Sequence, residues 1–209
     1  MNRALALQAL INDFAAVHRS HYLPGTDERE NDIHHSFSVA MLAWFVHDRL
    51  DLGLDMEKVM KYALVHDLVE VYAGDTNAYA DARTREHKKN IEAASLEKIE
   101  AEFRTIFPDL TACIRAYEAR SDAEARFVWT IDKMQAMIQG KADAYRPFYE
   151  QGLRSTDVRR VHGSHATGAY PPARAHYEEI LEAFLKDFDD SRSDRNGTIA
   201  ARSTPARKK

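Results

Sequence analysis

Apolar residues recur every three to four positions along most of this chain, which is the periodicity of amphipathic helices. The stretches 20–32 and 147–172 lack this periodicity and contain Gly, Pro and helix-capping residues, so they predict loops. No segment convincingly predicts a strand. The pattern therefore predicts an all-α fold, a bundle of about six to seven helices over residues 3–19, 34–50, 56–72, 83–106, 109–119, 121–140 and 173–187.

The length of 209 residues is enough for a single domain with a sizeable core. We expect that domain to span residues 1–188, since no internal repeat divides the chain. Residues 189–209 are polar and end in the sequence PARKK, which predicts a disordered tail.

Charge and cysteine content narrow the class of protein. The 29 Lys and Arg nearly balance the 33 Asp and Glu, which disfavours binding to nucleic acid or to a membrane surface. Cys113 is the only cysteine, so an internal disulfide and a thiolate metal cluster are excluded. No apolar run is as long as a membrane span, and the N-terminus lacks the pattern of a signal peptide. We therefore expect a cytoplasmic protein.

The third predicted helix carries ionisable residues on its apolar face. Val59, Ala63, His66 and Glu70 are spaced by three or four residues, which places them on one stripe. Asp67 lies next to His66 and reaches the same region from the side. Burial of such groups costs free energy unless they are paired or bind a metal ion.

Two other predicted helices show the same feature. His35 shares a stripe with small and branched apolar residues of the second helix, and Asp132 lies among apolar residues of the sixth. Bundles build metal sites from His and carboxylate side chains that several helices bring together. The apolar side expected for the second helix also includes Phe37, Met41, Trp44 and Phe45.

Each of these residues alone is more often a structural residue than a ligand, but the combination points to a metal site. It offers nitrogen and oxygen donors without sulfur, which suits one divalent ion. The donor set does not choose among Mn, Co, Mg, Zn, Ni and Fe. The candidate ligands are His35, His66, Asp67 and Asp132.

Three segments around these residues resemble the HD-domain phosphohydrolase superfamily, which is named for the dipeptide His66-Asp67. Residues 66–75, HDLVEVYAGD, are similar to the H-D-x-x-E-x-x-x-G-D motif of its 5′-deoxynucleotidase branch. Residues 29–41 and 121–134 look like the segments that carry the family's first metal His and last Asp. The resemblance covers about residues 5–140 and leaves 141–188 as an extension.

The resemblance implies an HD-domain helical bundle that acts as a metal-dependent phosphatase. Its substrates would be (deoxy)nucleoside 5′-monophosphates, hydrolysed to nucleoside and phosphate, and it would form a homodimer. The four candidate ligands would hold one divalent metal ion. Glu70 would activate water, Asp75 would orient water or the leaving oxygen, and Arg19 would contact the phosphate. Weaker candidates for binding the substrate are Arg29, Arg83, Lys88 and Lys89.

Two positions depart from the family pattern. His34 stands directly before His35, where the family commonly has Glu, and we assign the ligand to His35 because it lies on the apolar stripe. Ser20 follows Arg19 where the better-studied nucleotidases have Trp, which leaves sugar and base recognition open.

Three other functions remain as alternatives. A deoxynucleoside triphosphate hydrolase would need several convergent Lys and Arg, and no such cluster is apparent near the motif. A di-iron oxygenase on the same fold would need two further His between the HD pair and Asp132, where the chain has only His87. A non-catalytic module is disfavoured because the ligands, Glu70 and Asp75 are all present.

Overall fold

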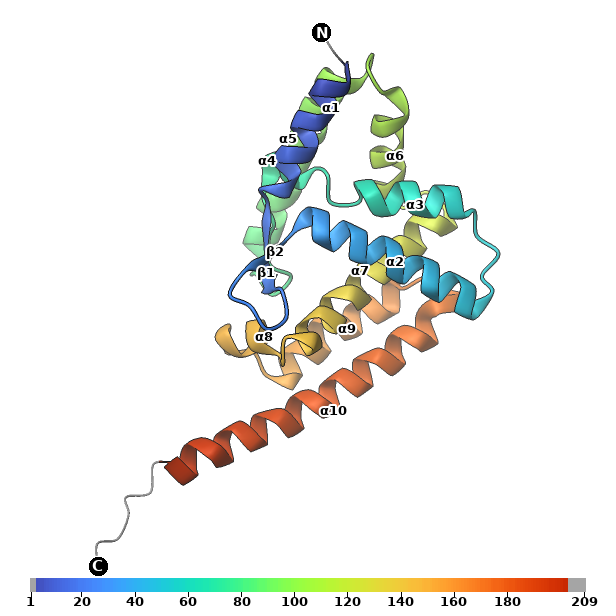
Figure 1. The fold of residues 1–209 in the computed structure, drawn as a ribbon. Helices are drawn as coiled ribbons and strands as arrows, with labels where there is room; N and C mark the ends of the chain where they lie inside the picture. Colours follow the sequence, from blue (N-terminus) through green and yellow to red (C-terminus); the bar gives the residue numbers. More distant parts are fainter. Residues whose placement is uncertain (1–2, 203–209) are drawn as a thin grey trace, which may run out of the picture.

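The structure is a computed structural model that describes residues 3–202, except for the side chains of Ala82 and of 193–202. Helices make up most of this part of the chain, which confirms the predicted all-α class (Figure 1). The elements are α1 Arg3–Ala15, β1 His18–Tyr22, β2 Arg29–Asn31, α2 Asp32–Leu50, α3 Met56–Val65, α4 Glu70–Ala73, α5 Ala82–Phe103, α6 Pro108–Glu118, α7 Ala123–Ala142, α8 Arg146–Glu150, α9 Ser155–Gly168 and α10 Pro171–Arg202.

Helices α2, α3 and α7 pack against one another in the centre of the molecule (Figure 1). Val39 and Val46 of α2, Val59 and Ala63 of α3, and Ile131 of α7 are completely buried. These positions recur at helical spacing, so each helix turns one apolar stripe toward the other two. The same stripes carry His35 and Asp132, which explains how ionisable groups reach the interior.

Two further groups of helices cover this centre. Helices α1, α4, α5 and α6 share a second apolar cluster, which includes Phe14, Val69, Ile99 and Phe103. Helices α9 and α10 pack on α7 from another side (Figure 1). Within the described residues, no helix is both long and apolar enough to cross a membrane.

Helix α9 lies where the sequence predicted an irregular stretch, so that prediction was wrong. The carboxylate of Asp157 accepts a hydrogen bond from the backbone N–H of Arg154 at 3.0 Å, which satisfies a free donor at the start of the helix. Val158, Val161 and Ala166 then bury one face of α9. This packing outweighs the low helix propensity of its glycines.

The third predicted helix, 56–72, is broken in the middle. Helix α3 ends at Val65, and residues 66–69 form tight turns before α4 begins at Glu70. The N–H of Leu68 bonds to the C=O of Val65 at 3.0 Å, and that of Glu70 bonds to the C=O of Asp67 at 2.8 Å. These bonds span three residues instead of four, which tightens the backbone and turns Asp67 toward His35.

One face of α2 is exposed against expectation. The side chains of Phe37, Met41, Trp44 and Phe45 are 65%, 48%, 53% and 60% exposed. They lie on the face opposite to Val39 and Val46, because a helix rotates about 100° per residue. The prediction that these large residues face the core was therefore wrong, and α2 has two apolar faces.

The predicted loop 20–32 contains two short antiparallel strands, which the sequence pattern did not reveal. Strands β1 and β2 pair with a register irregularity. Short polar strands such as HRSHY and REN carry no apolar alternation, so they resemble loop sequence. The pairing matters because Arg19 lies on β1, and β1 packs on α7 beside the metal ligands.

Helix α10 continues to Arg202, well past the end predicted at residue 187. The disordered tail predicted for 189–209 therefore begins inside a helix, and residues 203–209 lie outside the described part of the chain.

Gly140 on α7 is expected to tolerate no larger residue. A Cβ atom at this position would collide with the ring of Phe148, which holds α8 against α7. We predict that Gly140→Ala destabilises the protein by about 1–3 kcal/mol, because overpacking displaces buried groups. Thermal unfolding should show this as a lower midpoint.

Gly163→Ala is the matched control for that variant. Gly163 lies in α9, and a Cβ atom added there would have open space for 4 Å around it. The same change should therefore stabilise its helix by up to about 1 kcal/mol. Equal effects of the two substitutions would contradict the packing of Phe148.

Candidate metal centre and its cavity

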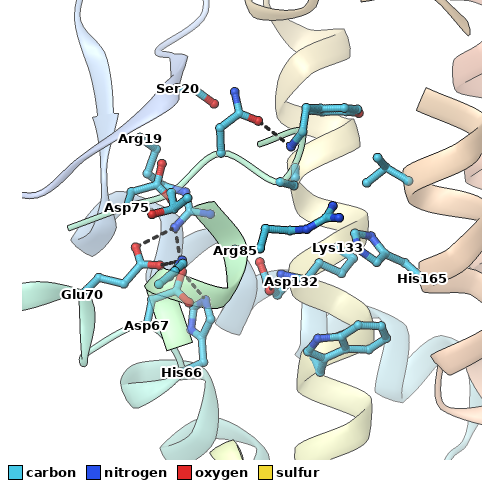
Figure 2. Close-up of a pocket in the computed structure, with 18 of the residues that line it drawn as sticks. Arg19, Ser20, His66, Asp67, Glu70, Asp75, Arg85, Asp132, Lys133 and His165 are labelled. Atoms are coloured by element: carbon cyan, nitrogen blue, oxygen red, sulfur yellow. Dashed lines mark hydrogen bonds and ion pairs between the residues drawn. The ribbon is translucent and has the colours of Figure 1, made fainter. Parts of the chain in front are cut away.

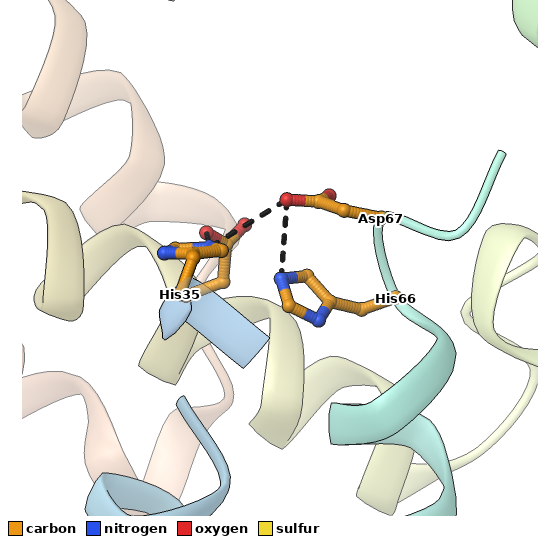
Figure 3. Close-up of side chains that lie close together, drawn as sticks. His35, His66 and Asp67 are labelled. Atoms are coloured by element: carbon orange, nitrogen blue, oxygen red, sulfur yellow. Dashed lines mark hydrogen bonds and ion pairs between the residues drawn. The ribbon is translucent and has the colours of Figure 1, made fainter. Parts of the chain in front are cut away.

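The four predicted metal ligands meet in the structure. Their donor atoms all lie within 4.8 Å of one another. The Nε2 atom of His35 is 3.2 Å from Oδ1 of Asp132 and 3.5 Å from Oδ2 of Asp67. The same Asp67 oxygen is 3.2 Å from Nε2 of His66, so this carboxylate faces both imidazole rings (Figure 3).

Both histidines are oriented by partners behind them. The Nδ1 atom of His35 lies 2.9 Å from Oε1 of Gln135, and Nδ1 of His66 lies 2.9 Å from the C=O of Ala63. Gln135 in turn donates its Nε2–H to Glu30 at 3.1 Å, which directs its oxygen toward His35. Each Nδ1 therefore donates, and each Nε2 lone pair points into the cluster. This is the arrangement that outer hydrogen bonds give to metal-binding histidines.

His34 takes no part in the cluster. Its side chain is 48% exposed, and its Nδ1 lies 3.3 Å from Oε1 of Glu30. His35 is completely buried. The residue on the apolar stripe is therefore the one that reaches the centre.

The charges around the cluster keep both carboxylates ionised. Burial opposes ionisation of Asp67, but His66 and Arg19 hold the pKa of Asp67 well below its usual value. Burial also opposes ionisation of Asp132, and Lys133 and His35 lower the pKa of Asp132 below the usual range. Two carboxylates in a buried site attract a cation.

The two imidazoles respond differently to these charges. Burial and the charge of Arg19 lower the pKa of His35, so its ring is neutral. Burial would also lower the pKa of His66, but Asp67 and Asp132 outweigh it and raise that pKa. Positive charge is thus favoured beside His66, and a proton and a metal ion would compete for its Nε2.

A divalent ion fits this donor set. The Nε2 atom of His66 is buried and has no hydrogen-bond partner among the described residues. A buried polar atom without a partner costs free energy, and a cation between the rings and carboxylates would provide one. Two imidazole nitrogens and two carboxylate oxygens suit several divalent ions and do not select one.

Arg19 lies directly beside the cluster (Figure 2). Its Nη1 atom is 2.6 Å from Oδ2 of Asp67, 3.1 Å from Oδ1 of Asp32 and 3.8 Å from Oε2 of Glu70. Burial would lower the pKa of Arg19, but Asp67, Asp75 and Glu70 raise it well above its usual value. The guanidinium is therefore a fixed positive charge at the edge of the candidate metal centre.

Glu70 is buried at the start of α4. Its Oε1 accepts a hydrogen bond from Nζ of Lys88 at 2.6 Å, while its Oε2 has no hydrogen-bond partner among the described residues. Burial and the charge of Asp67 raise the pKa of Glu70 well above its usual value. Such a carboxyl group exchanges protons closer to neutral pH.

Asp75 follows Gly74, whose φ of 73° allows the chain to turn after α4. Its carboxylate points toward Arg19 in Figure 2 and contributes to raising the pKa of Arg19. Asp75 lines the same cavity as Glu70. The structure thus brings together the four candidate ligands, Glu70, Asp75 and Arg19.

A cavity of about 620 Å³ opens beside these residues, a size that accommodates a small organic ligand. Contrary to the expectation that basic residues do not converge here, Lys and Arg from five parts of the chain line it. The sequence could not show this, because these residues are far apart in it. They are Arg19, Arg85, Lys88, Lys89, Arg120, Lys133 and Arg160.

Several residues of this site escaped the sequence analysis. Gln135 lies one turn after Asp132 on α7, so its helical spacing could have identified it. The Nζ atom of Lys133 is 2.6 Å from Oδ2 of Asp132, but helical spacing could not have identified Lys133 as a residue of the site. Arg83 does not line the cavity, and Arg29 donates to the C=O of Ser20 and stacks over Tyr22 at 4.1 Å.

Residues 13–170 match the HD domain family, which is most of the chain. This protein therefore belongs to the HD domain family. The His66-Asp67 pair at the centre of the cluster agrees with that assignment.

Curated relatives match shorter segments. The chain is 28% identical over 140 residues to the 5′-deoxynucleotidase HDDC2 of Xenopus laevis, covering 65% of this chain and 66% of that protein. It is 29% identical over 106 residues to the human protein of the same name, covering 50% of each chain. The 5′-deoxynucleotidase hdd1 of Schizosaccharomyces pombe is 26% identical over 120 residues, 55% of this chain and 59% of that protein. The chain thus spans between half and two thirds of the length of these relatives.

Solved structures share the fold at low identity. A predicted metal-dependent phosphohydrolase from Magnetospirillum magnetotacticum MS-1 superposes with a TM-score of 0.72 at 21% identity, covering 88% of this chain and 94% of that one. A conserved hypothetical protein from Pyrococcus furiosus superposes with a TM-score of 0.58 at 20% identity, covering 85% of this chain and 99% of that one. These likenesses show that the chain shares the helical fold of these proteins.

Proposed function

We propose that this protein is a metal-dependent phosphomonoesterase that hydrolyses (deoxy)nucleoside 5′-monophosphates to nucleoside and phosphate. The observation that carries the proposal is the cluster of His35, His66, Asp67 and Asp132, because its donors adjoin a cavity of nucleotide size. The names of the curated relatives support the same substrate class.

We assign metal binding to the four clustered side chains. A divalent ion held by them supplies a Lewis acid that polarises a phosphate and lowers the pKa of water. The two histidines and two carboxylates fix its position, since Gln135 and Ala63 hold the imidazole rings from behind.

The other residues have separate tasks in this proposal. Glu70 takes the proton from the attacking water, since its Oε2 has no hydrogen-bond partner among the described residues and its pKa is raised. Arg19 offers a guanidinium at the edge of the centre and offsets negative charge on the phosphate during the reaction. Asp75, across from Arg19, orients the water or the leaving oxygen.

The cavity extends beyond the residues that resemble the nucleotidase motifs. Residues 141–188 supply Pro147, Phe148, His162 and His165 to its wall. This contribution supports a single functional domain over 1–188 rather than a core with a dispensable extension.

The di-iron alternative lacks the further histidine ligands that it needs among the described residues. His87 is exposed on α5 and does not line the cavity. A second iron would need histidine ligands that the described residues do not place beside the cluster.

A substrate panel tests the proposed function. Deoxynucleoside and ribonucleoside 5′-monophosphates are assayed for phosphate release with Mn²⁺, Co²⁺ or Mg²⁺, and again with excess chelator. We expect release that depends on the added metal. If no monophosphate is hydrolysed with any of these ions, the proposal is wrong.

We further propose that the protein is a homodimer through the exposed face of α2. Its four large apolar side chains form a patch of a kind that monomeric proteins rarely leave in water. Asp48 and Arg49 border the patch, and two copies related by a twofold axis could pair these opposite charges.

The variant Phe45→Asp tests this surface. It places a charge in the patch, so we expect light scattering to show a shift from dimer to monomer. Leu64→Asp is the matched control, because Leu64 is an equally exposed apolar residue on α3 that is not one of the four patch residues. A wild-type protein that is monomeric at micromolar concentration would refute the assignment.

A further inference from the structure

Basic residues gather at the end of the cavity around His165. Arg85, Arg120 and Lys133 line the cavity together with His165. Burial, together with the charges of these three cations, lowers the pKa of His165 to about 4. Figure 2 shows Arg85 and Lys133 beside His165 on the far side of Asp132 from Arg19. They come from α5 and α7, and Arg120 lies in the turn before α7.

The protein neutralises these three cations to different extents. Arg85 and Arg120 form no ion pair with any carboxylate in the described part of the chain, although both line the cavity. Glu118 lines the same cavity, and the charge of Arg120 acts to lower the pKa of Glu118. Arg120 instead lies over the ring of Trp129, with 4.6 Å between its guanidinium carbon and the ring centroid. Among the described carboxylates Lys133 pairs with Asp132 alone, at 2.6 Å, and a metal ion bound to that carboxylate would weaken this pair.

The opposite end of the cavity has a different balance of charge. There Arg19 pairs with Asp67 and Asp32, and Lys88 pairs with Glu70 and Glu92. Each of these cations already has carboxylate partners. Arg85 and Arg120 near His165 therefore differ from Arg19 and Lys88 in having no ion pair within the described residues.

His165 adds an unsatisfied hydrogen-bonding group at the same place. Its Nδ1 atom is buried and has no hydrogen-bond partner among the described residues. The ring is held by an edge contact with Trp129, with centroids 5.6 Å apart. A neutral imidazole whose position is fixed can donate one hydrogen bond to a phosphate oxygen.

We propose that Arg85, Arg120 and Lys133 form a second anion-binding subsite, which holds a second phosphate group of the substrate. The first phosphate then lies at the metal centre. That the substrate is a nucleotide rests on the proposed phosphatase function. The preferred substrate would be a nucleotide with more than one phosphate, attached either along the 5′ chain or at the 3′ position. Monophosphates would be accepted with weaker binding.

Steady-state kinetics with four substrates test the subsite and separate the two positions of the second phosphate. They are deoxyadenosine 5′-monophosphate, 5′-diphosphate, 5′-triphosphate and 3′,5′-bisphosphate. We expect at least one substrate with a second phosphate to have a KM about tenfold below that of the monophosphate. Arg120→Gln and Arg85→Gln should each raise the KM of that substrate about tenfold, while the KM of the monophosphate stays within about twofold of the wild-type value.

Arg104→Gln is the matched control, because Arg104 is exposed at the end of α5 and does not line the cavity. It should change no KM. Equal KM values for all four substrates, or equal losses in the three variants, would overturn the proposal. Thermal unfolding of each variant identifies any that fail to fold.

Binding measured without turnover separates this proposal from the proposed function. Isothermal titration in excess chelator compares the 5′-monophosphate with the 3′,5′-bisphosphate and the 5′-triphosphate. Tighter binding of a compound with a second phosphate, lost in Arg120→Gln but kept in Arg104→Gln, supports the subsite even if no ester is hydrolysed. Equal affinity of the three compounds overturns it, whatever the activity.

Discussion

Replacement of His66 by alanine should abolish metal-dependent phosphate release, with kcat/KM at least about a thousandfold lower, or about 4 kcal/mol of transition-state stabilisation. Its Nε2 atom lies among the other three donors and has no hydrogen-bond partner among the described residues. Loss of that ligand leaves one imidazole and two carboxylates to hold the ion. The measurement is the rate of phosphate release from a deoxynucleoside 5′-monophosphate at saturating Mn²⁺ and Co²⁺.

His87→Ala is the control for this variant. His87 is an exposed residue of α5 that does not line the cavity, so its removal should leave kcat/KM unchanged. Full activity of His66→Ala would show that the cluster does not support the reaction. Loss of activity in His87→Ala would instead revive the di-iron interpretation.

Glu70→Gln should have the second largest effect, a decrease in kcat of about 10²- to 10⁴-fold, while metal binding is retained. Glutamine keeps the shape of the side chain and can still accept the hydrogen bond from Lys88. It cannot take a proton from water. That task is suggested by the raised pKa of Glu70 and by its Oε2 atom, which has no hydrogen-bond partner among the described residues. The measurements are kcat and the metal content of the same preparation.

Glu57→Gln controls for the loss of an ion-paired glutamate. Glu57 pairs with Lys61 at 2.8 Å on the exposed side of α3, away from the cavity, and its replacement should change kcat by less than about twofold. A Glu70→Gln protein with normal kcat would mean that another group handles the proton. A variant that has lost its metal would show that Glu70 helps to hold the ion.

The sequence predicted the helical class and the identity of the clustered residues for one physical reason. Charged groups on apolar stripes are costly, so His35, His66 and Asp132 stand out against the valines and isoleucine that share those stripes. The structure places these residues in one cluster, with His35 on α2, Asp132 on α7 and His66 directly after α3. Periodicity is a local signal. It sufficed for His35 and Asp132 because the stripe of each lies on a single helix, and for His66 because this residue directly follows α3.

Features that depend on tertiary structure could not be predicted in this way. The break after Val65 has no Pro or Gly to mark it, and Asp67 reaches the cluster only because of that break. Helix α2 has two apolar faces, and periodicity cannot tell which one is buried. Arg85 and Arg120 lie far apart in the sequence and converge only where the chain brings α5 next to α7.

The metal content of the purified protein tests the central claim most directly. Mass spectrometry of the native chain, dialysed against Mn²⁺ or Co²⁺ and then against metal-free buffer, should find about one divalent ion per chain in the wild type. His87→Ala should retain this content, and His66→Ala should lose most of it. A wild-type protein that binds no divalent ion, or a His66→Ala variant that binds as much as the wild type, would contradict the metal centre proposed for these four residues.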